Sequence, residues 1–236
     1  MNAVILDEIS FEPAFERIAK KLHVKEGSAN ADELQRLLSE AVAVARPKAL
    51  YKVAYVESRT EDTVSLDGQT FDSRVLQVNL ENVHRVFPYV ATCGQELYEW
   101  RTSLDDMLEG YYAEVINEAA LSAARRTLRG HLTETYGLGD TATMNPGSLE
   151  DWPIRAQRPL FALLGDPEAA IGVHLSQSML MIPPKSVSGI RFPTEERFES
   201  CQLCPREGCP SRKAPYDEDL YERKFSRSTT ESETSP

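Results

Sequence analysis

Residues 171–192 read IGVHLSQSMLMIPPKSVSGIRF, and this stretch says more about the fold than any other part of the chain. Val173 and Leu175 alternate with their neighbours, and alternation resumes at Ser186–Ser188, so the pattern predicts two short strands. Between them the Pro183-Pro184 pair stops any helix and removes two donors from a strand ladder. A polar turn of this kind between two apolar strands is typical of backbone that positions a ligand.

The chain before this stretch changes its hydrophobic period several times. Helical spacing predicts helices over 12–22 and 31–45, and a period of two predicts strands from 50 to 80 and from 85 to 92, with Asp67-Gly68 as a hairpin turn. A single helix is predicted over 107–136, ended by Gly137, and a shorter one over 153–164 with a proline near its start.

Strands and helices do not alternate as β-α-β units, which argues against a doubly wound sheet. We therefore expect an α+β fold: a twisted antiparallel sheet from 50–92 and 172–192, with the helix 107–136 packed across it. The expected organisation is one domain over 1–195, a cysteine-rich metal-binding segment over 196–224, and a disordered tail over 225–236. The tail is rich in Ser, Thr and Glu and lacks a core-forming pattern.

The chain has 236 residues and a net charge of −11. This acidity opposes binding to nucleic acid, because phosphate contacts need clustered Lys and Arg. No apolar run approaches the ~18 residues of a membrane span, and residues 1–13 lack the basic and apolar regions of a signal peptide. We expect a cytoplasmic protein whose partner is a small molecule or another protein, with no membrane or nucleic-acid role.

Three of the four cysteines, Cys201, Cys204 and Cys209, lie close together near the C-terminus. In a cytosolic chain this pattern favours metal or redox chemistry over disulfides. Thiolates at this spacing suit Zn²⁺ or an iron–sulfur cluster, and both normally use four protein ligands. Cys93, at the end of strand 85–92, is the only thiol left to complete the set. The alternatives are an open three-cysteine site and reduced thiols that hold no metal.

The order of motifs over 140–192 points to a known family. Pro146-Gly147 is followed by a helix ending at 160–164, then by Gly172–Ser178, and then by Pro183 and Ser186–Gly189. This order resembles the activation domain of cobalamin-dependent methionine synthase. The similarity is weaker over 3–136, and the cysteine segment is more similar to free-standing relatives of that domain. The resemblance implies that domain's α+β fold and a site for S-adenosylmethionine.

The resemblance places this site on two loops. One loop contributes Lys185 and Ser186. In the other, the family carries an arginine three residues before its proline and an aromatic residue directly after its glycine, where this chain has Thr143 and Ser148. An ordinary loop before an ordinary helix would show the same Pro-Gly pattern. This Pro-Gly loop, the first of the two along the chain, comprises Thr143, Met144, Asn145, Pro146, Gly147 and Ser148.

The chemistry implied by the resemblance is reductive methylation. A cob(II) corrinoid accepts an electron, and the resulting cob(I) takes the sulfonium methyl group of S-adenosylmethionine, so no acid–base catalytic residue is expected. No Asp-x-His-x-x-Gly segment is present, so the corrinoid must be carried by a partner, either a corrinoid protein or a cobalamin-dependent methyltransferase. Because the reaction consumes an electron, a [4Fe-4S] cluster is favoured over zinc at the cysteines.

Two other functions fit the same residues. In one, the chain acts within a small cobalamin-dependent methyltransferase and its cysteines pass electrons to cobalt. In the other, it has lost S-adenosylmethionine binding and is a non-catalytic docking module for a corrinoid protein. The departures at Thr143 and Ser148 favour the docking module.

Overall fold

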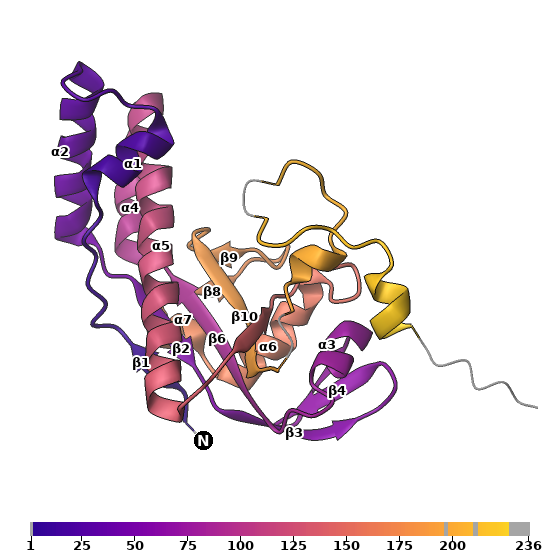
Figure 1. Cartoon of the computed structure of the whole chain (residues 1–236). Helices are drawn as coiled ribbons and strands as arrows, with labels where there is room; N and C mark the ends of the chain where they lie inside the picture. Colours follow the sequence, from indigo (N-terminus) through magenta and orange to yellow (C-terminus); the bar gives the residue numbers. More distant parts are fainter. Residues whose placement is uncertain (1, 196–197, 210–211, 227–236) are drawn as a thin grey trace, which may run out of the picture.

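The computed structural model describes residues 2–195, 198–209 and 212–226 (Figure 1). Its centre is an eight-stranded sheet in which every pairing is antiparallel, so the predicted α+β fold is confirmed. Six strands follow the order β1-β2-β6-β3-β4-β5, and β10 pairs with both β6 and β7. The strands are Val4–Leu6 (β1), Lys48–Tyr51 (β2), Ala54–Arg59 (β3), Thr63–Leu66 (β4), Gln69–Asp72 (β5), Arg85–Thr92 (β6), Thr141–Met144 (β7) and Ser186–Pro193 (β10), with a separate hairpin of His174–Leu175 (β8) and Met181–Ile182 (β9).

Helices cover both faces of this sheet. The longest, α5, begins after Asp106, whose carboxylate accepts from the amides of Leu108 and Glu109, and ends at Gly137 in the left-handed conformation. It packs against β2 and β6, as the sequence predicts. The helices are Phe15–Leu22 (α1), Ala29–Val44 (α2), Arg74–Asn79 (α3), Gln95–Thr102 (α4), Met107–Tyr136 (α5), Gln157–Leu164 (α6) and Pro167–Ile171 (α7), with short turns at Ile154–Ala156 (η1), Ser200–Leu203 (η2) and Tyr221–Phe225 (η3).

Alternating side chains of the central strands divide the interior into two cores. Phe87 and Tyr89 face the first core, which α1, α2, α4 and α5 cover. Val86 and Val90 face the second core, which α3, α6 and α7 cover. Because successive strand residues point to opposite faces, a single strand, β6, supplies both cores and is buried along nearly its whole length.

One local prediction is wrong. The period-two pattern extended the strands through Val75 and Val78, but this segment forms α3. Ser73 caps the helix by accepting from the Leu76 amide at 2.9 Å, and Asp151 accepts from the amides of Arg74 and Val75 at 3.1 Å each. These capping contacts favour helix over strand, and Asp151 comes from a distant part of the chain.

The C-terminal segment is part of the folded unit. Phe198 and Phe225 are buried in the second core and meet edge to face, with ring centroids 5.9 Å apart. The predicted disordered tail therefore begins too early, because Phe225 is fully buried. The rest of that predicted tail, 227–236, lies outside the described residues.

The molecule has a tall helical arm and a broader lobe (Figure 1). The arm holds α1, α2, α4 and the first half of α5, and the lobe holds α3, α6 and the C-terminal segment. Within the described ranges, none of the helices has the length and apolarity needed to cross a membrane.

Candidate ligand site

The two loops predicted to form the site lie along adjacent strands. Thr143 and Met144 of β7 pair with Arg191 and Ile190 of β10. Because the pairing is antiparallel, the chain after Met144 runs toward the start of β10. Asn145 accordingly donates from Nδ2 to the Ser188 carbonyl at 2.6 Å. The loop 143–148 and the beginning of β10 are thus brought together at one edge of the sheet.

A glycine allows this close approach. A Cβ atom at Gly189 would lie 2.5 Å from both Asn145 Nδ2 and the Met144 carbonyl oxygen. No side chain fits between β10 and β7 at this point. Gly147 is restricted in a second way, because its φ is +82° and a Cβ would lie 2.8 Å from Ile154 Cδ1.

Most polar groups of the loop 143–148 are engaged within the protein. Gly147 donates its amide to the Trp152 carbonyl at 2.8 Å, and the Ser148 amide and hydroxyl both reach the Asn145 carbonyl, at 3.1 and 2.6 Å. Met144 and Pro146 are buried. The backbone amides of Gly147 and Ser148 are therefore already paired within the protein.

The residues predicted from the second loop also have internal partners. Lys185 forms an ion pair with Glu114 of α5 at 3.3 Å. Ser186 donates to the Thr92 hydroxyl at 2.8 Å, and the buried Ser188 hydroxyl lies 3.4 Å from Gln157 Oε1. These contacts fix the start of β10 against β6, α5 and α6.

A cavity of about 870 Å³ opens beside the loop 143–148. We call it the acidic cavity; the segment from Gly147 to Ile154 lines one side, and the C-terminal segment lines the other. Tyr216 and Tyr221 offer aromatic rings, each about half exposed. Four carboxylates also line it, namely Glu150, Asp151, Asp217 and Glu218.

Two of these carboxylates are already paired and two are available. Asp151 caps α3, and Asp217 forms an ion pair with Arg223 at 2.8 Å, which lowers its pKa. Glu150 and Glu218 are exposed, and neither has a side-chain partner within the described part of the chain. The cavity therefore presents two free negative charges and two aromatic rings. Sequence reasoning missed these residues; the aromatic and acidic run at 216–218 was the available signal.

Trp152, which follows the loop 143–148 in the chain, is a packing residue. It is fully buried in the second core and meets Phe71 edge to face at 6.2 Å. Its side chain is not on the surface of the acidic cavity.

The cysteine segment is organised by one arginine. Arg212 donates from Nη1 to the Cys201 carbonyl at 2.9 Å and from Nη2 to the Cys204 carbonyl at 3.0 Å and to the Arg206 carbonyl. The Lys213 amide lies 3.4 Å from Cys201 Sγ. Among the described residues, which include all four cysteines, no three His, Cys, Asp or Glu side chains are grouped closely enough to hold a metal ion.

Cys93 is separated from the other thiols. It is fully buried in the first core, whereas Phe198 and Leu203 anchor the cysteine segment in the second core, on the opposite face of the sheet. Burial raises the pKa of Cys93 to about 12, so the thiol is held in its protonated form. These residues do not fit a four-cysteine site, and the metal at Cys201, Cys204 and Cys209 stays a prediction.

Comparison with solved structures identifies the fold. The chain is similar to a structure described as the crystal structure of the MetH reactivation domain bound to AdoHcy, with a TM-score of 0.57 and 14% sequence identity. The match covers 85% of this chain and 81% of the other. No family model and no curated protein sequence matches the chain. The architecture is therefore that of the MetH reactivation domain.

Proposed function

We propose that this chain binds S-adenosylmethionine beside the loop 143–148 and supports reductive methylation of a corrinoid carried by a partner protein. When bound, S-adenosylmethionine supplies a sulfonium methyl group that a reduced corrinoid can take, leaving S-adenosylhomocysteine. The fold shared with a reactivation domain bound to AdoHcy supports this proposal. The observation that carries it is the acidic cavity, which Gly147 and Ser148 of the predicted site help to line.

The acidic cavity suits this ligand in size and in charge. Its volume of about 870 Å³ lies within the ~300–1,000 Å³ range of small-molecule sites. Glu150 and Glu218 would attract the positive sulfonium, and Tyr216 and Tyr221 offer faces on which an adenine ring can stack. The protein's own role is to position the methyl donor and to exclude water from it.

Calorimetric titration with S-adenosylmethionine and with S-adenosylhomocysteine tests the proposal. A carboxylate about 4 Å from the sulfonium would contribute ~1 kcal/mol to the binding free energy in water, which corresponds to about a fivefold change in affinity. We expect Glu150→Gln and Glu218→Gln each to weaken S-adenosylmethionine binding by about this factor. Binding of S-adenosylhomocysteine should change little, because its sulfur is uncharged.

Glu222→Gln is the matched control. Glu222 is an exposed acid on the same segment as Glu218, and it does not line the acidic cavity. If Glu222→Gln and Glu218→Gln weaken S-adenosylmethionine binding equally, the net charge of the protein, and not the position of Glu218 in the cavity, sets the affinity. Failure of the native chain to bind either ligand at millimolar concentration would overturn the proposal.

A docking module for a corrinoid protein is the second candidate. The internal hydrogen bonds of Asn145, Ser148 and Ser186 favour it, because these side chains serve the fold rather than an open site. Under this function the chain would bind a corrinoid protein equally well with and without S-adenosylmethionine. If the chain supports reductive methylation, S-adenosylmethionine would change its affinity for the corrinoid protein.

A further inference from the structure

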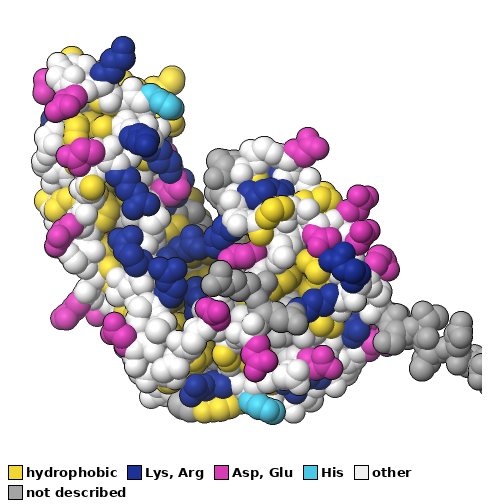
Figure 2. All heavy atoms as spheres, in the orientation of Figure 1, with side chains coloured by type: hydrophobic (Ala, Val, Ile, Leu, Met, Phe, Trp, Pro, Cys, Tyr) yellow, Lys and Arg dark blue, Asp and Glu magenta, His cyan; other side chains and the backbone are white. Residues whose placement is uncertain are grey.

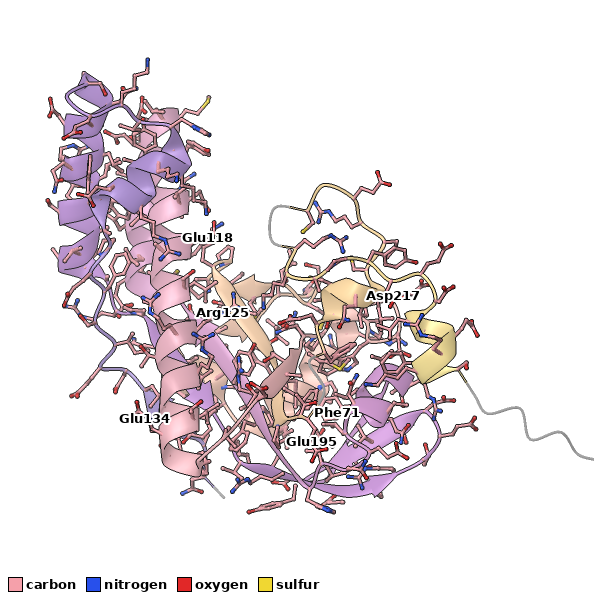
Figure 3. The ribbon with its side chains drawn as sticks, in the orientation of Figure 1. Phe71, Glu118, Arg125, Glu134, Glu195 and Asp217 are labelled. Carbon is pink, nitrogen blue, oxygen red and sulfur yellow. The ribbon has the colours of Figure 1, made fainter. Side chains whose placement is uncertain are left out.

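A second cavity, of about 480 Å³, is lined in part by Thr143 and shares no lining residue with the acidic cavity. We call it the basic hollow; α5 forms one wall, and β7 and β10 form its floor. In Figure 2, Lys and Arg side chains gather in the depression between the helical arm and the lobe, and Figure 3 shows Arg125 on the side of α5 that faces β10. Its five cationic side chains are Arg125, Arg126, Arg129, Arg191 and Lys213.

The backbone explains why these side chains meet. Arg125 and Arg129 are one helical turn apart, so they lie on one side of α5. Arg191 lies between Ile190 and Phe192, which point into the second core, so its side chain points to the other face of the sheet, toward α5. Thr143, its cross-strand partner, shares that face.

The charge in this hollow is opposite to that of the whole protein. Two carboxylates, Asp140 and Glu199, line it beside the five cations, which leaves a net charge of +3, in a chain whose net charge is −11. Glu199 is paired with Lys213 at 3.7 Å. No ion pair within the described ranges involves any of the four arginines, so the excess positive charge has no counter-ion among those residues.

Arg191 has donors that nothing in the described chain uses. Its Nη1 donates to the Thr141 hydroxyl at 2.7 Å, but its Nε is buried and has no hydrogen-bond partner. Burial lowers the pKa of Arg191, as do the like charges of Arg129 and Arg125, although Tyr89 and Glu199 act in the opposite direction. A buried donor without a partner costs free energy that an anionic ligand would recover.

We propose that the basic hollow binds a phosphate group, held by Arg125, Arg129 and Arg191. The negative charge of a phosphate group offsets part of the net charge of +3, and its oxygens can accept from several guanidinium groups at once. The same field repels a sulfonium, so this site is distinct from the one proposed for S-adenosylmethionine. The phosphate belongs either to a free metabolite or to the phosphodiester of an incoming corrinoid.

Titration of the whole chain with inorganic pyrophosphate tests the proposal. We expect saturable binding, weakened about tenfold or more by Arg129→Gln and by Arg191→Gln, because each removes a charge-assisted hydrogen bond. Arg129 is exposed on α5, so its variant should fold even if the half-buried Arg191 cannot be replaced. Arg158→Gln is the matched control; this exposed arginine of α6 lies outside the basic hollow, and its variant should bind as the native chain does.

Competition then separates the two sources of phosphate. Cobalamin carries the phosphodiester and cobinamide lacks it, so displacement of pyrophosphate by cobalamin alone identifies the corrinoid as the source. If neither displaces it, the ligand is a free phosphorylated molecule. The proposal is overturned if pyrophosphate does not bind, or if Arg158→Gln weakens binding as much as Arg129→Gln does. Neither result bears on S-adenosylmethionine binding, which the separate titration measures.

Discussion

Replacing Gly189 by alanine should disrupt the contact that holds the predicted ligand loop on the sheet. The new Cβ would lie 2.5 Å from the Met144 carbonyl oxygen and from Asn145 Nδ2. One of these atoms is backbone, so the clash cannot be relieved by a side-chain rotation alone. We expect β7 to move away from β10 and the hydrogen bond from Asn145 to the Ser188 carbonyl to break.

The cost has two parts. Inserting a methyl group into a packed region costs ~1–3 kcal/mol, and losing one hydrogen bond costs ~0.5–1.5 kcal/mol. Together they lower the free energy of unfolding by about 1.5–4.5 kcal/mol, which corresponds to a decrease of about 1 M in the urea midpoint. Since the loop 143–148 also borders the acidic cavity, S-adenosylmethionine binding should weaken in the same variant.

Gly139→Ala provides the control. A Cβ atom at Gly139 would have no atom within 4 Å, and this residue has no positive φ. The free energy of unfolding of this variant should therefore be within about 0.5 kcal/mol of that of the native chain. Urea unfolding followed by fluorescence measures both. If Gly189→Ala and Gly139→Ala are equally stable, the close approach of β7 and β10 does not constrain the loop.

Three other predictions concern the core and the cysteines. Burial raises the pKa of Cys93 from 9.0 to about 12, so the unfolded chain releases this proton at a lower pH than the folded chain does. The stabilisation is therefore complete below about pH 9, and the free energy of unfolding falls by up to ~1.4 kcal/mol per pH unit as the pH rises toward 12. Urea unfolding at several pH values should show a smaller fall in Cys93→Ala. Phe225→Ala should cost ~3–5 kcal/mol, whereas deletion of 227–236 should leave the urea midpoint unchanged; equal effects would remove Phe225 from the core. The predicted metal is tested by anaerobic purification: a brown protein bleached by dithionite indicates an iron–sulfur cluster, one bound zinc indicates a structural site, and neither metal refutes the prediction at Cys201, Cys204 and Cys209.

Local sequence signals determined the longest elements. The helix over 107–136 and the strand over 85–92 have the predicted bounds. In both cases a long periodic pattern is bounded by residues with a clear physical preference, such as Gly137, which adopts a positive φ at the helix end. The antiparallel class also followed from the order of the elements, which lacks β-α-β units.

Tertiary contacts decided the short elements and the surroundings of the site. The six residues of α3 are too few for a helical period to stand out, and Asp151, far away in the chain, helps to cap them. The sequence places Thr143 and Arg191 far apart, and only the β7–β10 register makes them neighbours. The same register places Arg191 beside Arg125 and Arg129 of α5. The spacing of residues within one helix or strand cannot predict that side chains of two distant segments line one cavity. Cys93 shows the converse: the number of cysteines suggested a fourth ligand, but the alternation of β6 directs that thiol into the opposite core, because successive strand residues face opposite sides of the sheet.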